Sequence, residues 1–178
     1  MVVMKNIEVE VRSFISKEQY KKLLDFFKKN SDMITENDNQ ETFYFDQDLR
    51  IQRNNFFSKI WMKKGKLHDN HREEIEIKFD RKEFDNLEKL FLNLGYKIKV
   101  KWFRKRSEFK WGGITVCLDF TKGHGYIIEL EKMCSKASKQ KEFYFLKQKL
   151  ESLGIDITPK KDFDKKSQFY MKNWKSLL

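Results

Sequence analysis

The residues best suited to chemistry in this sequence are acidic pairs spaced two positions apart. Glu8 and Glu10 form one pair, and Glu129 and Glu131 form another much later in the chain. Alternate side chains of an extended strand point to the same face, so each pair presents its two carboxylates together, and Arg12 shares the face of Glu8 and Glu10. If these two faces meet, their carboxylates form a metal site.

A third acidic pair, Glu74 and Glu76, shares its predicted face with Arg72, while Ile75 and Ile77 point to the opposite side. For a single strand, an antiparallel sheet with one face in water explains such alternation. The repetition of the Glu-x-Glu pattern in three strands favours a different arrangement. It indicates a curled sheet whose charged faces line a polar tunnel inside a barrel, with helices over the apolar outside.

Carboxylates enclosed in such a tunnel repel one another unless cations compensate their charge. Oxygen ligands suit Mg²⁺ or Mn²⁺, and Mg²⁺ commonly combines one or two carboxylates with substrate phosphates. Basic side chains on the same faces are candidate phosphate ligands. They are Arg12, Arg50, Lys63, Arg72, Arg104 and Arg106. This lining of acids and bases fits a polyphosphate chelated to a divalent metal.

The elements that must position these residues follow from the periodicity of apolar side chains. A capping-box pattern from Ser16 to Gln19 predicts a helix that ends near Asn30, and a polar loop is expected over 31–39. Further helices are predicted over 81–94 and 138–153 and in the tail, 162–178. Strands are predicted over 7–12, 42–46, 49–53, 57–64, 72–78, 96–109, 114–120 and 127–132. This order indicates an α+β fold with mostly antiparallel pairing.

The length of 178 residues suits one domain, 1–178, and the absence of a long apolar run or a signal peptide predicts a cytoplasmic protein without membrane attachment. Cys117 and Cys134 have no metal-ligand spacing, so both are expected to be structural. The net charge of +11 implies an anionic partner. No signature of RNA recognition is present, which favours a small molecule over nucleic acid.

The chain also resembles a known family, the CYTH superfamily or triphosphate tunnel metalloenzymes, which includes class IV adenylyl cyclases, thiamine triphosphatases and inorganic triphosphatases. The fragments that carry the resemblance occur in order along almost the whole chain. They are Glu8-x-Glu10-x-Arg12, Tyr44-Phe45-Asp46, Leu49-Arg50-Ile51-Gln52, Ile60 to Lys63, Arg72-x-Glu74-x-Glu76, Leu94-Gly95-Tyr96, Arg104-x-Arg106, Asp119 with Gly123-x-Gly125, and Glu129-x-Glu131.

This resemblance implies a closed eight-stranded antiparallel β-barrel tunnel with helices packed on the outside. It implies metal ligands at Glu8, Glu10, Asp119, Glu129 and Glu131, catalytic carboxylates at Glu8, Glu10, Glu74 and Glu76, and phosphate ligands at the six bases named above. The sequence departs from the family pattern at two positions. Gln52 stands where a second Arg is usual, and Trp61 stands where a small polar residue is usual. Arg53 or Lys59 are candidates to replace the missing base.

The leading functional hypothesis is hydrolysis of a triphosphate, inorganic or carried by a small organic group, with Mg²⁺ or Mn²⁺ as cofactor. One alternative is a class IV adenylyl cyclase, which forms cyclic AMP and pyrophosphate from ATP. Another is a non-catalytic binder of nucleotide, polyphosphate or RNA, and the chain is expected to be a monomer or a homodimer. His124, between two glycines and beside Asp119, is predicted to be an exposed turn residue, with contact to substrate at the tunnel end as the alternative. His68 and His71 are predicted to lie in a surface turn.

Overall fold

The computed structural model describes residues 7–64 and 71–177, apart from the side chains of 47, 64 and 71–73. The predicted α+β class is confirmed by the eight strands and four α-helices that these residues form. The strands are β1 (Ile7–Ile15), β2 (Asp32–Tyr44), β3 (Leu49–Arg53), β4 (Ser58–Lys64), β5 (His71–Phe79), β6 (Val100–Trp111), β7 (Ile114–Thr121) and β8 (Gly125–Cys134). The helices are α1 (Lys17–Asn30), α2 (Phe84–Asn93), α3 (Lys139–Ser152) and α4 (Lys160–Leu177), with 3₁₀ turns η1 (Asp46–Asp48) and η2 (Arg81–Glu83).

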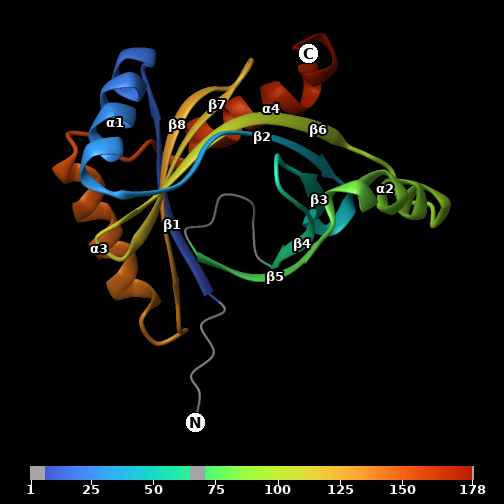
Figure 1. Ribbon diagram of the computed structural model, residues 1–178, viewed down its shortest axis with the longest axis horizontal. Coiled ribbons are helices and arrows are strands. Elements are labelled where there is room, and N and C mark those ends of the chain that lie inside the picture. Colours follow the sequence, from blue (N-terminus) through green and yellow to red (C-terminus); the bar gives the residue numbers. More distant parts are fainter. Residues whose placement is uncertain (1–6, 65–70, 178) are drawn as a thin grey trace.

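All strand pairings are antiparallel, and they join the strands in the order β1-β5-β4-β3-β2-β6-β7-β8. Strand β8 pairs in turn with β1, so the order is that of a closed barrel (Figure 1). The contact between β1 and β5 is short. It comprises three residue pairs, from Ile7 opposite Glu73 to Val9 opposite His71.

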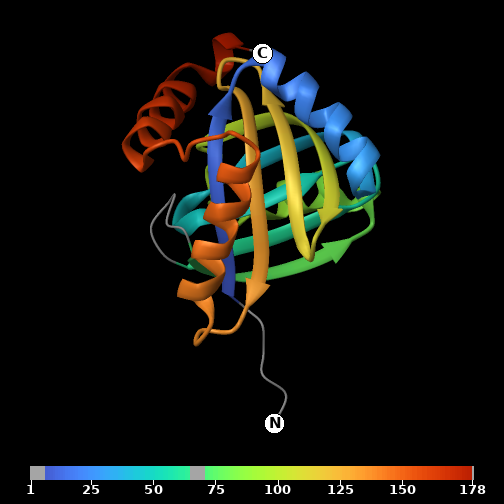
Figure 2. The same cartoon turned by 90° about the vertical axis from the view of Figure 1, so that its left-hand side faces the viewer.

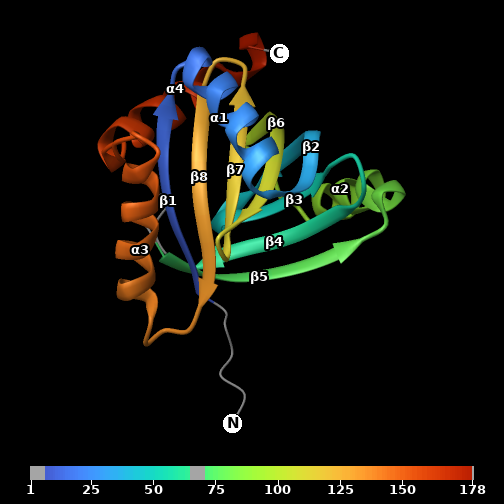
Figure 3. The same ribbon diagram turned by 60° about the vertical axis from the view of Figure 1, so that its left-hand side comes forward.

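The main hydrophobic core lies outside the ring of strands. Helices α1 and α3 lie against the outer face of β1, β7 and β8 (Figures 2 and 3). They bury Phe27 of α1 and Leu146 and Leu150 of α3 together with Val9 and Val11 of β1. Because these strands place their apolar side chains outward against the helices, their charged side chains point inward.

A second, smaller core lies between α2 and the outer face of β2 and β3. Phe84 of α2 packs there against Phe43 and Ile51. The predicted helix over 81–94 is therefore present, but it begins as the 3₁₀ turn η2 and continues as α2 from Phe84. Together the two cores leave the inner faces of the strands to polar groups.

The predicted capping box of α1 is confirmed in detail. The Gln19 amide donates to Ser16 Oγ at 3.1 Å, and the Ser16 amide donates to Gln19 Oε1 at 2.8 Å. These two bonds satisfy backbone groups that the first turn of a helix leaves without partners. They fix the point at which the chain leaves β1 and turns back over the barrel.

The prediction of a polar loop over 31–39 is wrong, because β2 already begins at Asp32. Irregular pairing with β6 between Met33 and Asp38, and a positive φ of 53° at Asn37, interrupt the alternation that marks a strand. Asp38 is polar although it does not lie in a solvent-exposed loop. Its carboxylate is buried and accepts a hydrogen bond from the Asn55 backbone amide at 2.8 Å. Strand β6 also begins later than predicted, at Val100.

Candidate functional site

The inner faces of the strands enclose a cavity of about 410 Å³. Most of the residues singled out by the charge pattern and the family resemblance line it. They are Glu8, Glu10, Arg12, Arg50, Lys63, Glu74, Arg104, Arg106, Asp119, Glu129 and Glu131. Strand pairing brings together the acidic pairs of β1 and β8, which are distant in sequence, and Glu10 lies directly opposite Glu131.

Glu8, Glu10 and Glu131 form an acidic cluster in which one carboxylate oxygen from each residue lies within 4.8 Å of the other two. Burial raises the pKa of Glu8, and the charge of Lys63 offsets this only in part. Burial and the nearby Glu8 raise the pKa of Glu131 well above its usual value. Both shifts reflect the cost of holding several negative charges together away from water.

The acidic cluster fits a hard divalent cation. All of its donor atoms are carboxylate oxygens, the ligands that Mg²⁺ and Mn²⁺ prefer. Among the described residues, Glu10 Oε1 and Glu74 Oε2 are buried and accept no hydrogen bond, although Arg12 Nη1 and Lys63 Nζ lie 3.0 and 3.2 Å from them. Each of these oxygens thus has an ion-pair partner but no hydrogen bond, and it keeps lone pairs that a cation can use.

Lys63 of β4 links the acidic cluster to β5. Its ammonium lies 2.5 Å from Glu8 Oε1 and 3.2 Å from Glu74 Oε2. Burial opposes the charge of Lys63, but Glu8, Glu10 and Glu74 outweigh it and raise the pKa of the ammonium. Lys63 therefore remains a cation beside the carboxylates.

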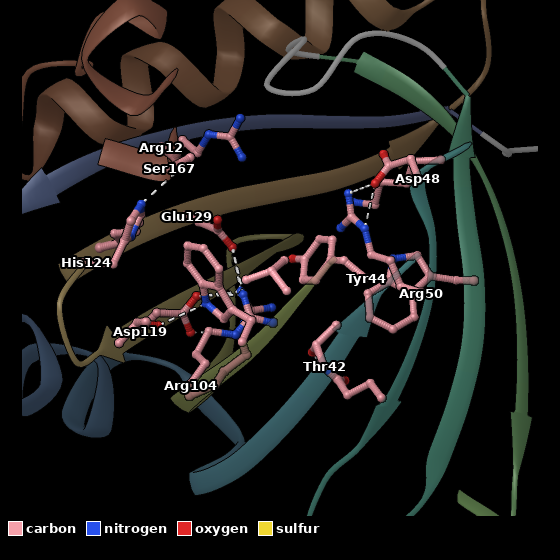
Figure 4. A pocket seen from close by; sticks show the side chains of 18 of the residues that line it. Arg12, Thr42, Tyr44, Asp48, Arg50, Arg104, Asp119, His124, Glu129 and Ser167 are labelled. Carbon is pink, nitrogen blue, oxygen red and sulfur yellow. Dashed lines mark hydrogen bonds and ion pairs between the residues drawn. The ribbon is translucent and has the colours of Figure 1, made fainter. Parts of the chain in front are cut away.

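A second group of carboxylates lies elsewhere in the cavity, against two arginines. Arg106 Nε donates to Asp119 Oδ1 at 2.7 Å, and Arg106 Nη2 donates to Glu129 Oε2 at 2.5 Å. Arg104 Nη1 donates to Asp119 Oδ2 at 3.0 Å. Figure 4 shows Arg104 and Glu129 converging on this region together with Asp119. We call these four residues the arginine–carboxylate cluster.

The charges in the arginine–carboxylate cluster compensate one another. Burial opposes the ionisation of Glu129, but Arg106 and Arg104 outweigh it and lower the pKa of Glu129 to about 2. Asp119 and Glu129 were predicted as metal ligands. The structure instead places both against guanidinium groups, and their role toward a metal stays a prediction.

Three of the other predicted bases and acids have distinct surroundings. Arg50 pairs with Asp48, donating to its Oδ1 from Nε at 2.8 Å, and its guanidinium lies 4.6 Å from the centroid of the Tyr44 ring. Glu76 lies outside the residues that line the cavity, with its Oε2 2.6 Å from Lys59 Nζ. The side chains of Arg72 and His71 lie outside the described residues, as does the whole of His68, although the Arg72 backbone pairs with Glu8. The prediction of a surface turn at His71 is wrong, because His71 is the first residue of β5 and pairs with Val9.

At the departure from the family pattern, Gln52 is buried in the cavity wall. Its Nε2 donates to Thr42 Oγ1 at 2.8 Å. Of the two candidate replacements for the missing base, Lys59 lines the cavity, whereas Arg53 pairs with Glu41 and Asp85 and lies over the ring of Phe84. Lys59 is therefore the base that remains on the inner face.

Sequence reasoning missed residues that support or line the cavity wall. Gln40 accepts hydrogen bonds from Arg104 Nε at 2.9 Å and from Arg104 Nη2 at 2.6 Å, and it lies in the segment wrongly predicted as a loop. His124 was predicted to be exposed, but it is 4% exposed and lines the cavity. The reason is α4, whose Ser167 lies 3.5 Å from His124 Nε2 (Figure 4). The sequence around His124 gave no indication that a distant helix would bury it.

In the part of the chain that the structure describes, none of the helices is long and apolar enough to cross a membrane. A comparison with curated proteins finds no match. Among solved structures, a conserved hypothetical protein from Pyrococcus furiosus is 25% identical, with a TM-score of 0.70 over 86% of this chain and 96% of its own.

Two further structures share the fold at lower identity. A Vibrio parahaemolyticus protein described as a "putative adenylate cyclase" is 14% identical, with a TM-score of 0.72 over 85% of this chain and 90% of its own. A Bacillus halodurans protein with the same description is 19% identical, with a TM-score of 0.61 over 86% and 94%. The CYTH domain model matches residues 6–161, which include every strand and the acidic and basic residues of the cavity. The chain belongs to the CYTH domain family.

Proposed function

We propose that the cavity binds a triphosphate together with Mg²⁺ or Mn²⁺ and that the chain hydrolyses it. The supporting observation is the balance of charge in the cavity wall. The acids in the wall are Glu8, Glu10, Asp48, Glu74, Asp119, Glu129 and Glu131, and the bases are Arg12, Arg50, Lys59, Lys63, Lys99, Arg104 and Arg106. These described residues are formally neutral as a set, so a polyphosphate enters favourably only with cations of its own.

In this proposal the acidic cluster of Glu8, Glu10 and Glu131 holds the cation. The cation, when bound, neutralises charge on the phosphate oxygens. Arg12 and Lys63 lie beside the same carboxylates and bind further phosphate oxygens, Arg12 through its planar fork and Lys63 as a point charge. The arginine–carboxylate cluster holds Arg104 and Arg106 in fixed orientations toward the cavity. Catalysis of phosphoryl transfer rests largely on such positioning and electrostatic stabilisation.

The test is a substrate panel of tripolyphosphate, ATP and thiamine triphosphate with Mg²⁺ or Mn²⁺, with the products resolved. Metal-dependent release of orthophosphate is expected. Glu10→Gln and Glu131→Gln should each lower turnover at least about a hundredfold, the scale of losing a main electrostatic contact. Glu151→Gln, on the exposed side of α3, is the matched control and should retain turnover. Unchanged turnover in both cavity variants would contradict the assignment of the acidic cluster.

A second candidate is cyclisation of ATP, because two structures with the same fold carry the description quoted above. The attacking group would then be a ribose hydroxyl rather than water. The same panel separates the two reactions. Cyclic AMP and pyrophosphate from ATP, without release of orthophosphate from tripolyphosphate, would favour the cyclase over the hydrolase.

A further inference from the structure

Helix α4 supplies part of the cavity wall, although almost all of it lies beyond the segment that the CYTH domain model matches. That segment ends at residue 161, and α4 runs from Lys160 to Leu177. Phe163, Ser167 and Met171, spaced four residues apart along one face of α4, all line the cavity. The charged residues of the cavity thus lie within the segment that the family model matches, whereas Phe163, Ser167 and Met171 lie beyond it.

The position of α4 is fixed by packing along its length. The Phe163 ring stacks on Phe14 of β1 at 4.3 Å, and the Tyr170 ring lies 4.1 Å from Trp102 of β6. Near the end of the helix, Leu177 approaches Gly123 so closely that a Cβ at that glycine would lie 2.5 Å from it. A helix held at both ends presents a defined surface to the cavity rather than a mobile one.

The surface around α4 differs from the rest of the cavity in its chemistry. Trp102, Val100 and Ile127 line the cavity from β6 and β8, and Trp102 Nε1 donates to Thr121 Oγ1 at 3.1 Å, which fixes the indole plane. His124 and Ser167 add the polar groups of this wall. A fixed aromatic ring among apolar side chains, with a few hydrogen-bonding groups, is suited to a planar organic ring.

The charged groups that lie over the aromatic rings of this surface are positive, whereas the nearby carboxylates of Asp119 and Glu129 are already paired with Arg104 and Arg106. The Arg12 guanidinium lies 4.9 Å from the centroid of the Phe163 ring, and the Lys166 ammonium lies 3.9 Å from that of Phe14. The residues that α4 contributes to the wall carry no charge. A positively charged ring bound here would be repelled by Arg12 and Lys166, and α4 supplies no carboxylate to the wall that would offset this. The surface therefore favours an uncharged ring.

We infer that α4 forms the subsite for the organic group of the substrate and that this group is a planar, uncharged ring such as a nucleobase. This inference rests on the proposed function, because the triphosphate is taken to occupy the charged part of the same cavity. It identifies the substrate class as nucleoside triphosphates, in preference to inorganic triphosphate or to a triphosphate ester of a cationic ring.

The test compares Met171→Ala with wild type, using ATP and tripolyphosphate as probes. Met171 is 39% exposed, so its truncation should leave the fold intact, which circular dichroism checks. KM for ATP should rise about tenfold, the scale of one lost contact to a base, while KM for tripolyphosphate stays within about twofold. Met33→Ala is the matched control, because Met33 is 43% exposed and lies outside the cavity.

Equal changes in KM for ATP and tripolyphosphate would overturn the inference, since they would show a structural effect of α4. A higher kcat/KM for thiamine triphosphate than for ATP would overturn the argument from charge. If wild type turns over neither ATP nor tripolyphosphate, the proposed function fails. Calorimetric titration of wild type and Met171→Ala with ATP then decides the subsite: about tenfold weaker binding by the variant supports it, and equal binding overturns it.

Discussion

The two groups of carboxylates inside the barrel are built from the same residue types but differ in what surrounds them. In the acidic cluster, Glu8, Glu10 and Glu131 converge on one another, and the pKa values of Glu8 and Glu131 are raised. In the arginine–carboxylate cluster, Arg104 and Arg106 bond to Asp119 and Glu129, and the pKa of Glu129 is lowered to about 2.

Carboxylates on the inner face of one barrel can therefore differ in the direction of their pKa shift. Glu129 and Glu131 are neighbours on the same face of β8, and the pKa of one falls while that of the other rises. The partners that neighbouring strands supply, Arg106 for Glu129 and Glu8 for Glu131, decide whether the pKa falls or rises. Glu129 lies 2.5 Å from the Arg106 guanidinium, whereas Glu131 lies 3.9 Å from it and close to Glu8 and Glu10, so Glu131 has more to gain from a cation than Glu129.

The largest effect on stability is expected when the compensating base is removed. Arg106→Met leaves Asp119 and Glu129 buried without their main partner and should lower the free energy of unfolding by about 3–5 kcal/mol, measured by urea denaturation. Arg53→Met is the matched control: its partners are partly exposed, so the loss should stay below about 1 kcal/mol. Equal losses in the two variants would show that the arginine–carboxylate cluster is no more costly to break than a surface ion pair.

The next largest effect concerns the pH dependence of stability in metal-free buffer. A lowered pKa means that the stability due to Glu129 is present above its unfolded value of 4.5 and is lost as pH falls through about 2. Glu129→Gln should therefore cost about 3 kcal/mol at neutral pH, and the difference from wild type should vanish near pH 2. Urea denaturation at a series of pH values measures it. A difference independent of pH would contradict the role of charge.

The sequence predicted the inner faces well where strands alternate without interruption. Glu8, Glu10 and Arg12 share a face with Glu131 opposite, as the alternation in β1 and β8 implied. Local sequence alone could not show which inward acids would meet which inward bases. The contact of Arg106 with Glu129 depends on how β7 separates β6 from β8, so it appears only when the strand order is known.

Other residues in or next to the cavity wall could not be recognised from local sequence. Asp38 and Gln40 looked like loop residues because a bulged strand with polar inward side chains lacks the usual alternation. The glycines around His124 correctly indicated a turn, but the burial of His124 within it depends on packing against Phe14, Trp102 and Tyr170 of α4. Ser167 and Met171 lie on a helix whose lysines suggest a solvated surface, so their place in the cavity wall depends entirely on tertiary contacts.

In the acidic cluster, the pH dependence of stability should have the opposite sign. The raised pKa of Glu131 means that its stabilising protonated form is fully present below pH 4.5 and that stability falls as pH rises above that value. In metal-free buffer Glu131→Gln should therefore be more stable than wild type at neutral pH, because the amide adds no negative charge beside Glu8 and Glu10. Urea denaturation with a chelator present measures this gain.

Adding Mg²⁺ or Mn²⁺ should then make wild type more stable than Glu131→Gln. At a cation concentration about 100 times Kd, wild type gains about 2.7 kcal/mol, whereas Glu131→Gln, which lacks one oxygen anion of the acidic cluster, gains little. Glu129→Gln is the decisive comparison, since its carboxylate is already held by Arg106 and its loss should leave most of the cation-dependent gain in place. If Glu129→Gln and Glu131→Gln lost that gain equally, the two groups of carboxylates would act as one metal site, and the distinction drawn from their pKa values would fail.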